Sequence, residues 1–246
     1  MRILQKGLIV SCYLESLRGC EKEFIACVIN HPHVVAVRVE GLDNIKWARL
    51  ISPNAFIIGL VKDMIQGKTY ITDKSEIVNI LTCGANMVAT EEIFYEWKIP
   101  SDTQDKYEYD IIDIDNETPI MLDLSRESLA QLKRCYDKDW MIANFINDSI
   151  LAGTLIFSTT YEHKAFDMIK EIRDIFPNAL VNLEGKIETQ EEILKGFAMD
   201  ADYITIGKAI NDPPTIINNL LANKFYIDNT ILQSCNQKNV YIDITD

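Results

Sequence analysis

The sequence ALVNLEGKIETQEEILKGFAMDADYITIGKAI, residues Ala179–Ile210, indicates the fold of this chain. Two short apolar segments, Ala179–Leu183 and Tyr203–Ile206, lead toward glycines, and a segment with helical periodicity, Gln190–Phe197, lies between them. Glycine lets backbone amides approach a ligand closely, and a helix N-terminus favours an anion. Two successive loops of this kind are typical of the phosphate site after strands seven and eight of a (β/α)8 barrel.

Further apolar segments precede this unit, and segments with helical periodicity separate most of them. They are Leu8–Ser11, Val34–Val39, Phe56–Val61, Met87–Ala89, Met141–Phe145 and Ala152–Phe157. These runs are short, continuous and rich in valine and isoleucine, as expected for parallel strands buried on both faces. Eight such strands in 246 residues favour a closed TIM barrel over an open doubly wound sheet, and no GxGxxG motif follows the first strand.

Two segments do not fit the alternation. Residues 93–124 are acidic and contain a turn signal at Asp115-Asn116, which predicts an inserted loop or hairpin after the fourth strand. This insertion is either a lid or a partner surface on the active-site face of the barrel, or a loop that simply extends into solvent. The tail Tyr226–Asp246 is either a strand packed outside the barrel or the arm of a homodimer. We therefore expect a barrel over residues 1–225 and a C-terminal extension over 226–246.

Composition limits the classes of partner. The net charge of −13 argues against nucleic acid, or an anionic membrane surface, as the main partner. No apolar run approaches the roughly 20 residues of a membrane-spanning helix. Six cysteines without a CxxC pair indicate free thiols in a reducing cytoplasm. The three histidines stand without further ligands at metal spacing, so we expect no metal.

Charged residues at the ends of predicted strands are candidates for chemistry. Lys62 follows Phe56–Val61, where partial desolvation lowers the pKa of a lysine and makes it a base or a nucleophile; alternatively it is a solvated cap. Arg38 binds a phosphate or carboxylate, or pairs with Glu40 or another neighbouring acid. Glu184 ends the seventh strand, and an acid opposite a lysine is a workable pair for moving a proton at carbon.

Smaller groups suit a phosphate or a sugar. Gly207 offers a backbone amide, and Lys208 offers a positive charge to a phosphate unless it is simply solvated. Hydroxyl residues around the sixth strand either bind a sugar or satisfy backbone groups. They are Thr154, Ser158, Thr159 and Thr160.

Several segments together resemble the N-acetylmannosamine-6-phosphate 2-epimerase family over about two thirds of the chain. They are GLIVSC (7–12), AVRVEGLDNIKWAR (36–49), IIGLVKD with TYIT (57–72), GANMVAT (84–90), LEGKIETQEEILKGF (183–197) and YITIGKAINDP (203–213). The resemblance implies an isomerase on a (β/α)8 barrel that interconverts N-acetylmannosamine 6-phosphate and N-acetylglucosamine 6-phosphate by inverting C2. It implies a phosphorylated amino sugar as ligand, no metal or organic cofactor, and a role in amino-sugar catabolism.

The resemblance also implies roles for individual residues. Lys62 is the catalytic base, Glu184 is its acidic partner, and Arg38 helps to hold the substrate. Gly185 and Gly207 contribute to the phosphate site.

The chain departs from the family pattern at several positions. Tyr13 stands where the family usually has glutamine, and Glu91 stands near the position of an aspartate after the fourth strand. Taking IANFI as the counterpart of the family's MADIS segment puts Asn144 in place of a pocket aspartate, where it can orient a lysine but cannot ionise. Asp212 precedes Pro213 where the family has an arginine. These departures favour an alternative: a phosphosugar-binding or structural barrel protein that has lost or changed the epimerase activity.

Overall fold

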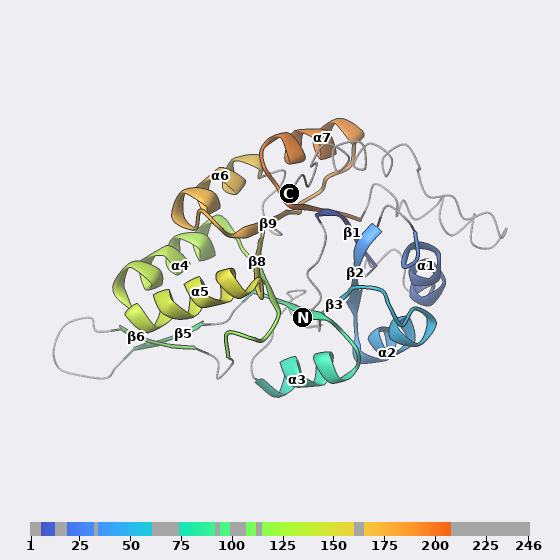
Figure 1. Ribbon diagram of the computed structural model, residues 1–246, viewed down its shortest axis with the longest axis horizontal. Coiled ribbons are helices and arrows are strands. Elements are labelled where there is room, and N and C mark those ends of the chain that lie inside the picture. Colours follow the sequence, from blue (N-terminus) through green and yellow to red (C-terminus); the bar gives the residue numbers. More distant parts are fainter. Residues whose placement is uncertain are drawn as a thin grey trace, which may run out of the picture.

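The computed structural model describes residues 6–12, 19–31, 34–60, 74–91, 94–98, 107–111, 115–159 and 165–207. Eight parallel strands of this part close into a barrel in the order β1-β10-β9-β8-β7-β4-β3-β2 (Figure 1). They are β1 (Gly7–Ser11), β2 (Val34–Glu40), β3 (Ile57–Leu60), β4 (Met87–Thr90), β7 (Ile120–Asp123), β8 (Leu155–Ser158), β9 (Leu180–Leu183) and β10 (Tyr203–Ile206). The predicted (β/α)8 class is therefore confirmed.

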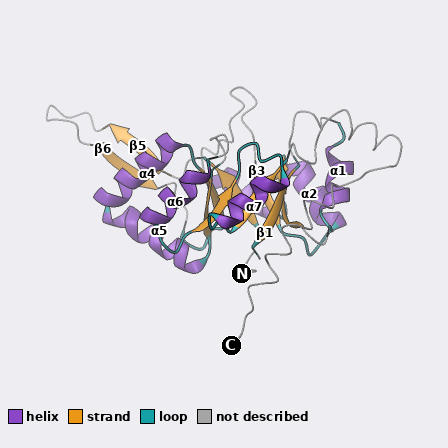
Figure 2. Cartoon of the chain, turned by 90° about the horizontal axis from the view of Figure 1, so that it is seen from above, coloured by secondary structure: helices purple, strands orange, loops and turns teal. Residues whose placement is uncertain are grey.

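Helices surround the barrel in both views (Figures 1 and 2). Those of the described residues are α1 (Glu21–Val28), α2 (Leu42–Ile51), α3 (Lys74–Thr82), α4 (Arg126–Lys138), α5 (Trp140–Ala152), α6 (Phe166–Ile175) and α7 (Gln190–Ala198). α7 begins with a reciprocal capping box, in which Thr189 accepts from the Glu192 N–H and Glu192 bonds back to the Thr189 N–H. None of these helices is long and apolar enough to cross a membrane.

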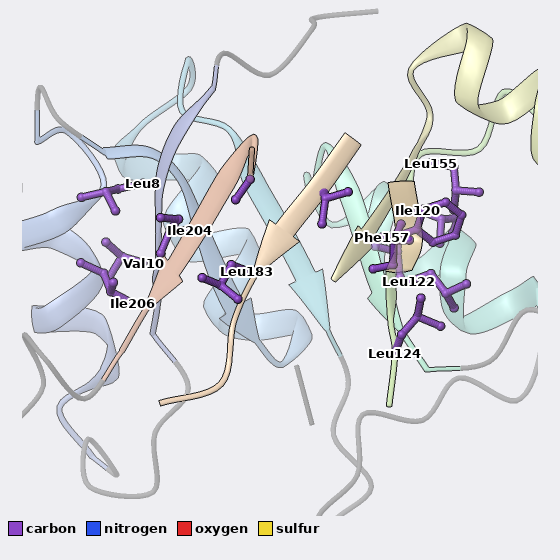
Figure 3. Close-up of a cluster of buried hydrophobic side chains, with 14 of the residues drawn as sticks. Leu8, Val10, Ile120, Leu122, Leu124, Leu155, Phe157, Leu183, Ile204 and Ile206 are labelled. Atoms are coloured by element: carbon purple, nitrogen blue, oxygen red, sulfur yellow. The ribbon is translucent and has the colours of Figure 1, made fainter. Parts of the chain in front are cut away.

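Alternation along the strands separates two hydrophobic cores. One core joins the outer face of the barrel to the helices, and Figure 3 shows strand residues of this set, among them Leu8, Val10, Leu183 and Ile204. The other core consists of strand residues only and fills the interior of the barrel. Its buried members are Ile9, Ala36, Ile58, Leu60, Met87, Ala89, Met121, Ile156 and Tyr203. The second set, with Leu180 of β9 packed against it, identifies the inward-facing positions of the strands.

Close packing of helices on the outer face requires small residues at some positions. A Cβ on Gly59 of β3 would lie 2.4 Å from Ile80 Cγ2 of α3 and 2.9 Å from Ile45 Cδ1 of α2. The missing side chain therefore lets both helices approach the strand.

The prediction that Met141–Phe145 forms the fifth strand is wrong. These residues belong to α5, which begins after Asp139 and ends at Gly153 in the left-handed conformation, φ 69°. The Asp139 carboxylate caps the helix by accepting from the N–H groups of Met141 and Ile142. The buried residues of α5 recur at helical spacing, a period that an isolated apolar run of five residues does not reveal.

The fifth barrel strand is β7, which lies between β4 and β8. Its four residues fall inside segment 93–124, which the sequence analysis assigned to an excursion from the barrel. The same segment contains an antiparallel hairpin, β5 (Phe94–Lys98) and β6 (Tyr107–Ile111), which lies outside the barrel (Figure 2). The insertion after the fourth strand is thus confirmed, although its last residues belong to the barrel. The predicted extension 226–246 lies outside the described residues.

A buried carboxylate connects several elements at the N-terminal face of the barrel. Asp202, directly before β10, accepts hydrogen bonds from Arg173 Nη2 and from the Val181 N–H, both at 2.8 Å, and pairs with Lys6. The side chain of Asp202 is 1% exposed, and its carboxylate links α6, β9 and the start of β1. This face of a barrel contributes stability rather than chemistry.

Candidate active site

Three charged side chains at the carboxyl ends of the strands meet in the interior of the barrel. Arg38 stands two residues after Ala36 in β2, and Asp123 stands two residues after Met121 in β7; both preceding residues belong to the interior core. Glu184 directly follows β9. Because every second residue of a strand faces the same way, Arg38 and Asp123 point into the barrel. We call Arg38, Asp123 and Glu184 the charged triad.

Arg38 crosses the barrel to reach the two acids. In the ring of strands β8 lies opposite β2, and β7 and β9 flank β8. Arg38 Nη2 donates to Asp123 Oδ2 at 2.7 Å, and Nη1 donates to Glu184 Oε2. One guanidinium therefore holds carboxylates from two strands of the far wall. Of the alternatives that the sequence left open for Arg38, the structure contains an ion pair with these two acids.

The members of the triad differ in burial. The side chains of Arg38 and Asp123 are 0% exposed, whereas that of Glu184 is 12% exposed. Glu184 is therefore the member most accessible to a ligand in the barrel mouth. One positive and two negative groups give the triad a formal charge of −1. Buried charges are tolerated when they are paired and hydrogen-bonded, so Arg38 fixes the positions of both carboxylates.

Asp123 corrects the prediction made for Asn144. Asn144 lies on the exposed side of α5, so the premise that put it in the pocket in place of an acid is wrong. The sequence analysis took IANFI for the end of the fifth strand. That strand end lies instead in the segment MLDLS, residues 121–125, which supplies the aspartate Asp123. The fifth strand thus ends with an acid, Asp123, and not with Asn144.

A second polar group lies in the interior beside the triad. Asn182 Nδ2 donates to Ser158 Oγ at 2.8 Å, and Thr205 Oγ1 donates to Asn182 Oδ1 at 3.0 Å. All three side chains are buried, and they connect β8, β9 and β10. The sequence analysis missed Asn182, although a polar residue two positions before Glu184 in an apolar strand is a signal of an inward polar site.

Thr159 and Gly185 shape the chain around Glu184. Thr159 Oγ1 donates to the Glu184 carbonyl at 3.0 Å and accepts from the Glu184 N–H at 3.1 Å. Of the alternatives for the hydroxyls near the sixth strand, Thr159 and Thr154 both satisfy backbone groups. Gly185 follows with φ 112°, a conformation that side chains disfavour, so the chain turns directly after the acid.

The remaining predicted residues fall into two groups. Gly207 directly follows β10, and Glu91 directly follows β4, both at strand carboxyl ends. Tyr13, Lys62 and Lys208 lie outside the described residues.

Cys12 is a poor candidate for a nucleophile. Cys12 follows β1, and burial raises the pKa of its thiol, which disfavours the reactive thiolate. Its Sγ lies 3.7 Å from the Val10 carbonyl and the residue packs in the outer core. The described part of the chain contains no group of three or more His, Cys, Asp or Glu residues arranged to hold a metal ion.

Comparison with known proteins gives one family. The family model for N-acetylmannosamine-6-phosphate epimerase, NanE, matches residues 24–225. No protein with a curated description matches the sequence.

Solved structures share the fold at low identity. The N-acetylmannosamine-6-phosphate 2-epimerase from Clostridium perfringens superposes with a TM-score of 0.57 at 19% identity, over 90% of this chain and 94% of that chain. Orotidine 5'-phosphate decarboxylase from Pyrococcus horikoshii OT3 gives 0.57 at 13% identity, over 93% and 99%. KGPDC from Streptococcus mutans gives 0.51 at 13%, over 94% and 99%. At these identities the superpositions establish the barrel fold alone.

Proposed function

This chain belongs to the N-acetylmannosamine-6-phosphate epimerase family, and on that premise we propose that it inverts C2 of a 2-acetamido-sugar 6-phosphate. The reaction would convert N-acetylmannosamine 6-phosphate into N-acetylglucosamine 6-phosphate. A proton leaves C2, beside the C1 carbonyl of the open-chain sugar, and a proton returns on the opposite face. The observation that carries the proposal is the charged triad, which combines a partly exposed acid with a fixed, buried arginine.

In this proposal Glu184, in its protonated form, donates a proton to C2 on the face opposite Lys62 and becomes a carboxylate, and the Lys62 ammonium then returns a proton to it through solvent. The carboxylate of Glu184 is held by Arg38 and its backbone by Thr159, which limits the positions that the acid can take. An acid held within hydrogen-bonding reach of the reacting atom contributes typically about 10²–10⁴-fold to proton transfer. Arg38 and Asp123 act by holding Glu184 and by setting the charge around it.

Lys62 is the proposed base. It stands two positions after Leu60, which belongs to the interior core at the end of β3, and strand alternation predicts the same side for both. When a neutral lysine takes the C2 proton it becomes an ammonium. Once Glu184 has given up its proton, the triad has a formal charge of −1 and supplies a counter-charge for that ammonium, because an opposite charge nearby favours the charged form.

The phosphate is proposed to bind near the last two strands. Gly185 and Gly207 follow β9 and β10, where backbone N–H groups can approach an anion. Lys208 and Tyr13 complete the proposed set of ligand-binding residues. A 6-phosphosugar should then raise the melting temperature, whereas the unphosphorylated sugar should not.

Deuterium exchange tests the reaction directly. The protein is incubated with N-acetylmannosamine 6-phosphate in deuterated water, and the C2 proton is followed by NMR. We expect exchange and epimerisation in the wild type, loss of both in Lys62→Ala, and a fall of at least about 10²-fold in Glu184→Gln. Lys46→Ala, an exposed lysine on α2, is the matched control and should retain full activity.

The alternative function has a distinct result. Tyr13 and Asp212 stand where the family has glutamine and arginine, which favours a barrel that binds phosphosugars without epimerising them. Thermal stabilisation by the 6-phosphosugar without C2 exchange at high protein concentration would support that alternative. Exchange that persists in Lys62→Ala would overturn the assignment of the base.

The proposal includes a reducing compartment, namely the cytoplasm. The five described cysteines, Cys12, Cys20, Cys27, Cys83 and Cys135, are free thiols. Free thiols of this kind are typical of proteins in a reducing environment.

A further inference from the structure

Thr159 makes an unusual contact with the chain at Glu184. Its backbone N–H donates to the Asn182 carbonyl at 3.1 Å, which continues the parallel ladder between β8 and β9. In a regular parallel ladder the next rung would run from the Glu184 N–H to the Thr159 carbonyl. The Glu184 N–H donates instead to the Thr159 side chain, Oγ1, at 3.1 Å.

The same hydroxyl also bonds the other backbone polar group of Glu184. Oγ1 donates to the Glu184 carbonyl at 3.0 Å, so one side-chain atom holds both the N–H and the C=O of the acid. Thr159 is 0% exposed, and Glu184 is followed at once by a glycine with φ 112°. The chain therefore bends sharply next to a residue whose backbone is fixed at two points.

We infer that Thr159 is a positioning residue for Glu184. The inference rests on the proposed function, because the position of the Glu184 carboxyl matters for catalysis only if Glu184 exchanges a proton with a substrate. Loss of the hydroxyl frees the Glu184 backbone beside the Gly185 bend and lets the carboxylate move relative to Arg38. Misplacement of a reacting group by about 1 Å can reduce the rate by about 10²-fold.

Threonine variants separate the hydroxyl from the methyl group. Thr159→Val removes the hydroxyl and keeps the shape, whereas Thr159→Ser keeps the hydroxyl. We expect kcat for C2 exchange to fall about 10- to 100-fold in Thr159→Val with KM within about twofold, and Thr159→Ser to stay within about threefold of the wild type. If Thr159→Val does not fold, Thr159→Ala takes its place.

The same strand offers a matched control. Thr154 precedes β8, is 2% exposed, and its Oγ1 bonds the backbone carbonyls of Asn116 at 2.6 Å and Ser149 at 3.1 Å. Thr154→Val therefore removes an equally buried hydroxyl at the opposite end of β8. It should lower the melting temperature about as much as Thr159→Val and leave kcat unchanged. Equal loss of kcat in both variants, or an unchanged kcat in Thr159→Val, would overturn the inference.

A second readout keeps this inference separate from the proposed reaction. The ¹³C resonance of the Glu184 carboxyl group, assigned by its absence in Glu184→Gln, should shift in Thr159→Val and stay in place in Thr154→Val. If the wild type shows no C2 exchange, the proposed reaction is wrong, and this resonance alone decides whether Thr159 positions Glu184. A resonance that does not move in Thr159→Val overturns the positioning role.

Discussion

Replacement of Arg38 by methionine tests whether the guanidinium holds the two acids of the triad. Methionine keeps part of the apolar stem but leaves Asp123, 0% exposed, and Glu184, 12% exposed, without their shared cation. Opposite charges about 4 Å apart attract by about 4 kcal/mol at an effective dielectric near 20. Removal of one partner of a buried pair typically destabilises by about 3–5 kcal/mol. We therefore expect the free energy of unfolding at neutral pH to fall by about 3–5 kcal/mol.

Urea denaturation followed by circular dichroism measures this change. For a chain of this size, about 2–4 °C in melting temperature accompanies each kcal/mol, so Arg38→Met should melt about 6–20 °C below the wild type.

The matched control is Arg126→Met. Arg126 also contacts two carboxylates, those of Asp167 and Glu171, but on the exposed surfaces of α4 and α6. Surface ion pairs contribute little, so this control should lose much less stability.

The reasoning also predicts a rescue. Combining Arg38→Met with Asp123→Leu and Glu184→Met removes both acids that Arg38 holds, and replacement of a whole buried ion set by apolar groups is often neutral or stabilising. The triple variant should therefore recover most of the lost stability while remaining inactive. Equal stability of Arg38→Met and Arg126→Met, or a triple variant no more stable than Arg38→Met, would refute the argument.

Three further perturbations probe other parts of the barrel. Gly59→Ala should destabilise by about 1–3 kcal/mol in urea melts, because its Cβ would lie 2.4 Å from Ile80 Cγ2, and the double variant with Ile80→Ala should lose less stability than the sum of the two single losses; additive losses would contradict the steric explanation. Asp202→Asn should lower the free energy of unfolding by about 1.5–3 kcal/mol, since Arg173 and Lys6 lose their carboxylate, and leave the rate of C2 exchange unchanged; slower exchange would show that this cluster acts on the site. Burial, together with the charge of Asp202, raises the pKa of Tyr203. The hydroxyl of Tyr203 then loses its proton at a lower pH in the unfolded chain than in the folded chain. The contribution of Tyr203 to the free energy of unfolding is therefore complete below about pH 10, the ordinary pKa of tyrosine, and declines as the pH rises above it. Tyr203→Phe should weaken this alkaline decline in urea melts at pH values on either side of 10, and an unchanged decline would contradict the assignment to Tyr203.

The sequence was sufficient to predict the barrel because most of the barrel strands have a local pattern. Largely apolar runs such as Val34–Val39 and Tyr203–Ile206 are confirmed as strands, since burial on both faces leaves few polar positions to alternate. Glu184 was predicted as a site residue for an equally local reason, because it stands where an apolar strand meets a glycine.

The fifth strand could not be identified by the same rule. β7 has only four residues, Ile120–Asp123, and follows an acidic segment, whereas Met141–Phe145 offers a longer apolar run. That run is apolar because one side of α5 packs on the barrel, and its helical period is visible only over the whole of Trp140–Ala152. The sequence analysis took the longer of the two runs for the fifth strand. It therefore considered Asn144, rather than Asp123, as the residue at the end of that strand.

The pairing of Arg38 with its two acids depends on closure of the barrel. The residues are separated by 85 and 146 positions in the chain, and no local pattern relates them. They meet because β2 lies three strands away from both β7 and β9 in the ring, and an arginine side chain is long enough to cross the interior. Sequence reasoning could predict an acid as the partner of Arg38, but the choice of partner follows from the strand order.

The two buried ion clusters of this barrel have different consequences for function. At the N-terminal face, Asp202 is paired with two cations, Arg173 and Lys6, and Arg173 also pairs with Asp200, so two acids meet two cations. At the C-terminal face the single guanidinium of Arg38 holds two carboxylates. Negative charge favours the formation of a cation nearby, and in the proposed reaction Lys62 becomes such a cation when it accepts the proton from C2. Among the described residues, the strand order thus places the triad at the carboxyl end of the barrel, where a substrate can enter, and the Asp202 cluster at the end that stabilises the fold.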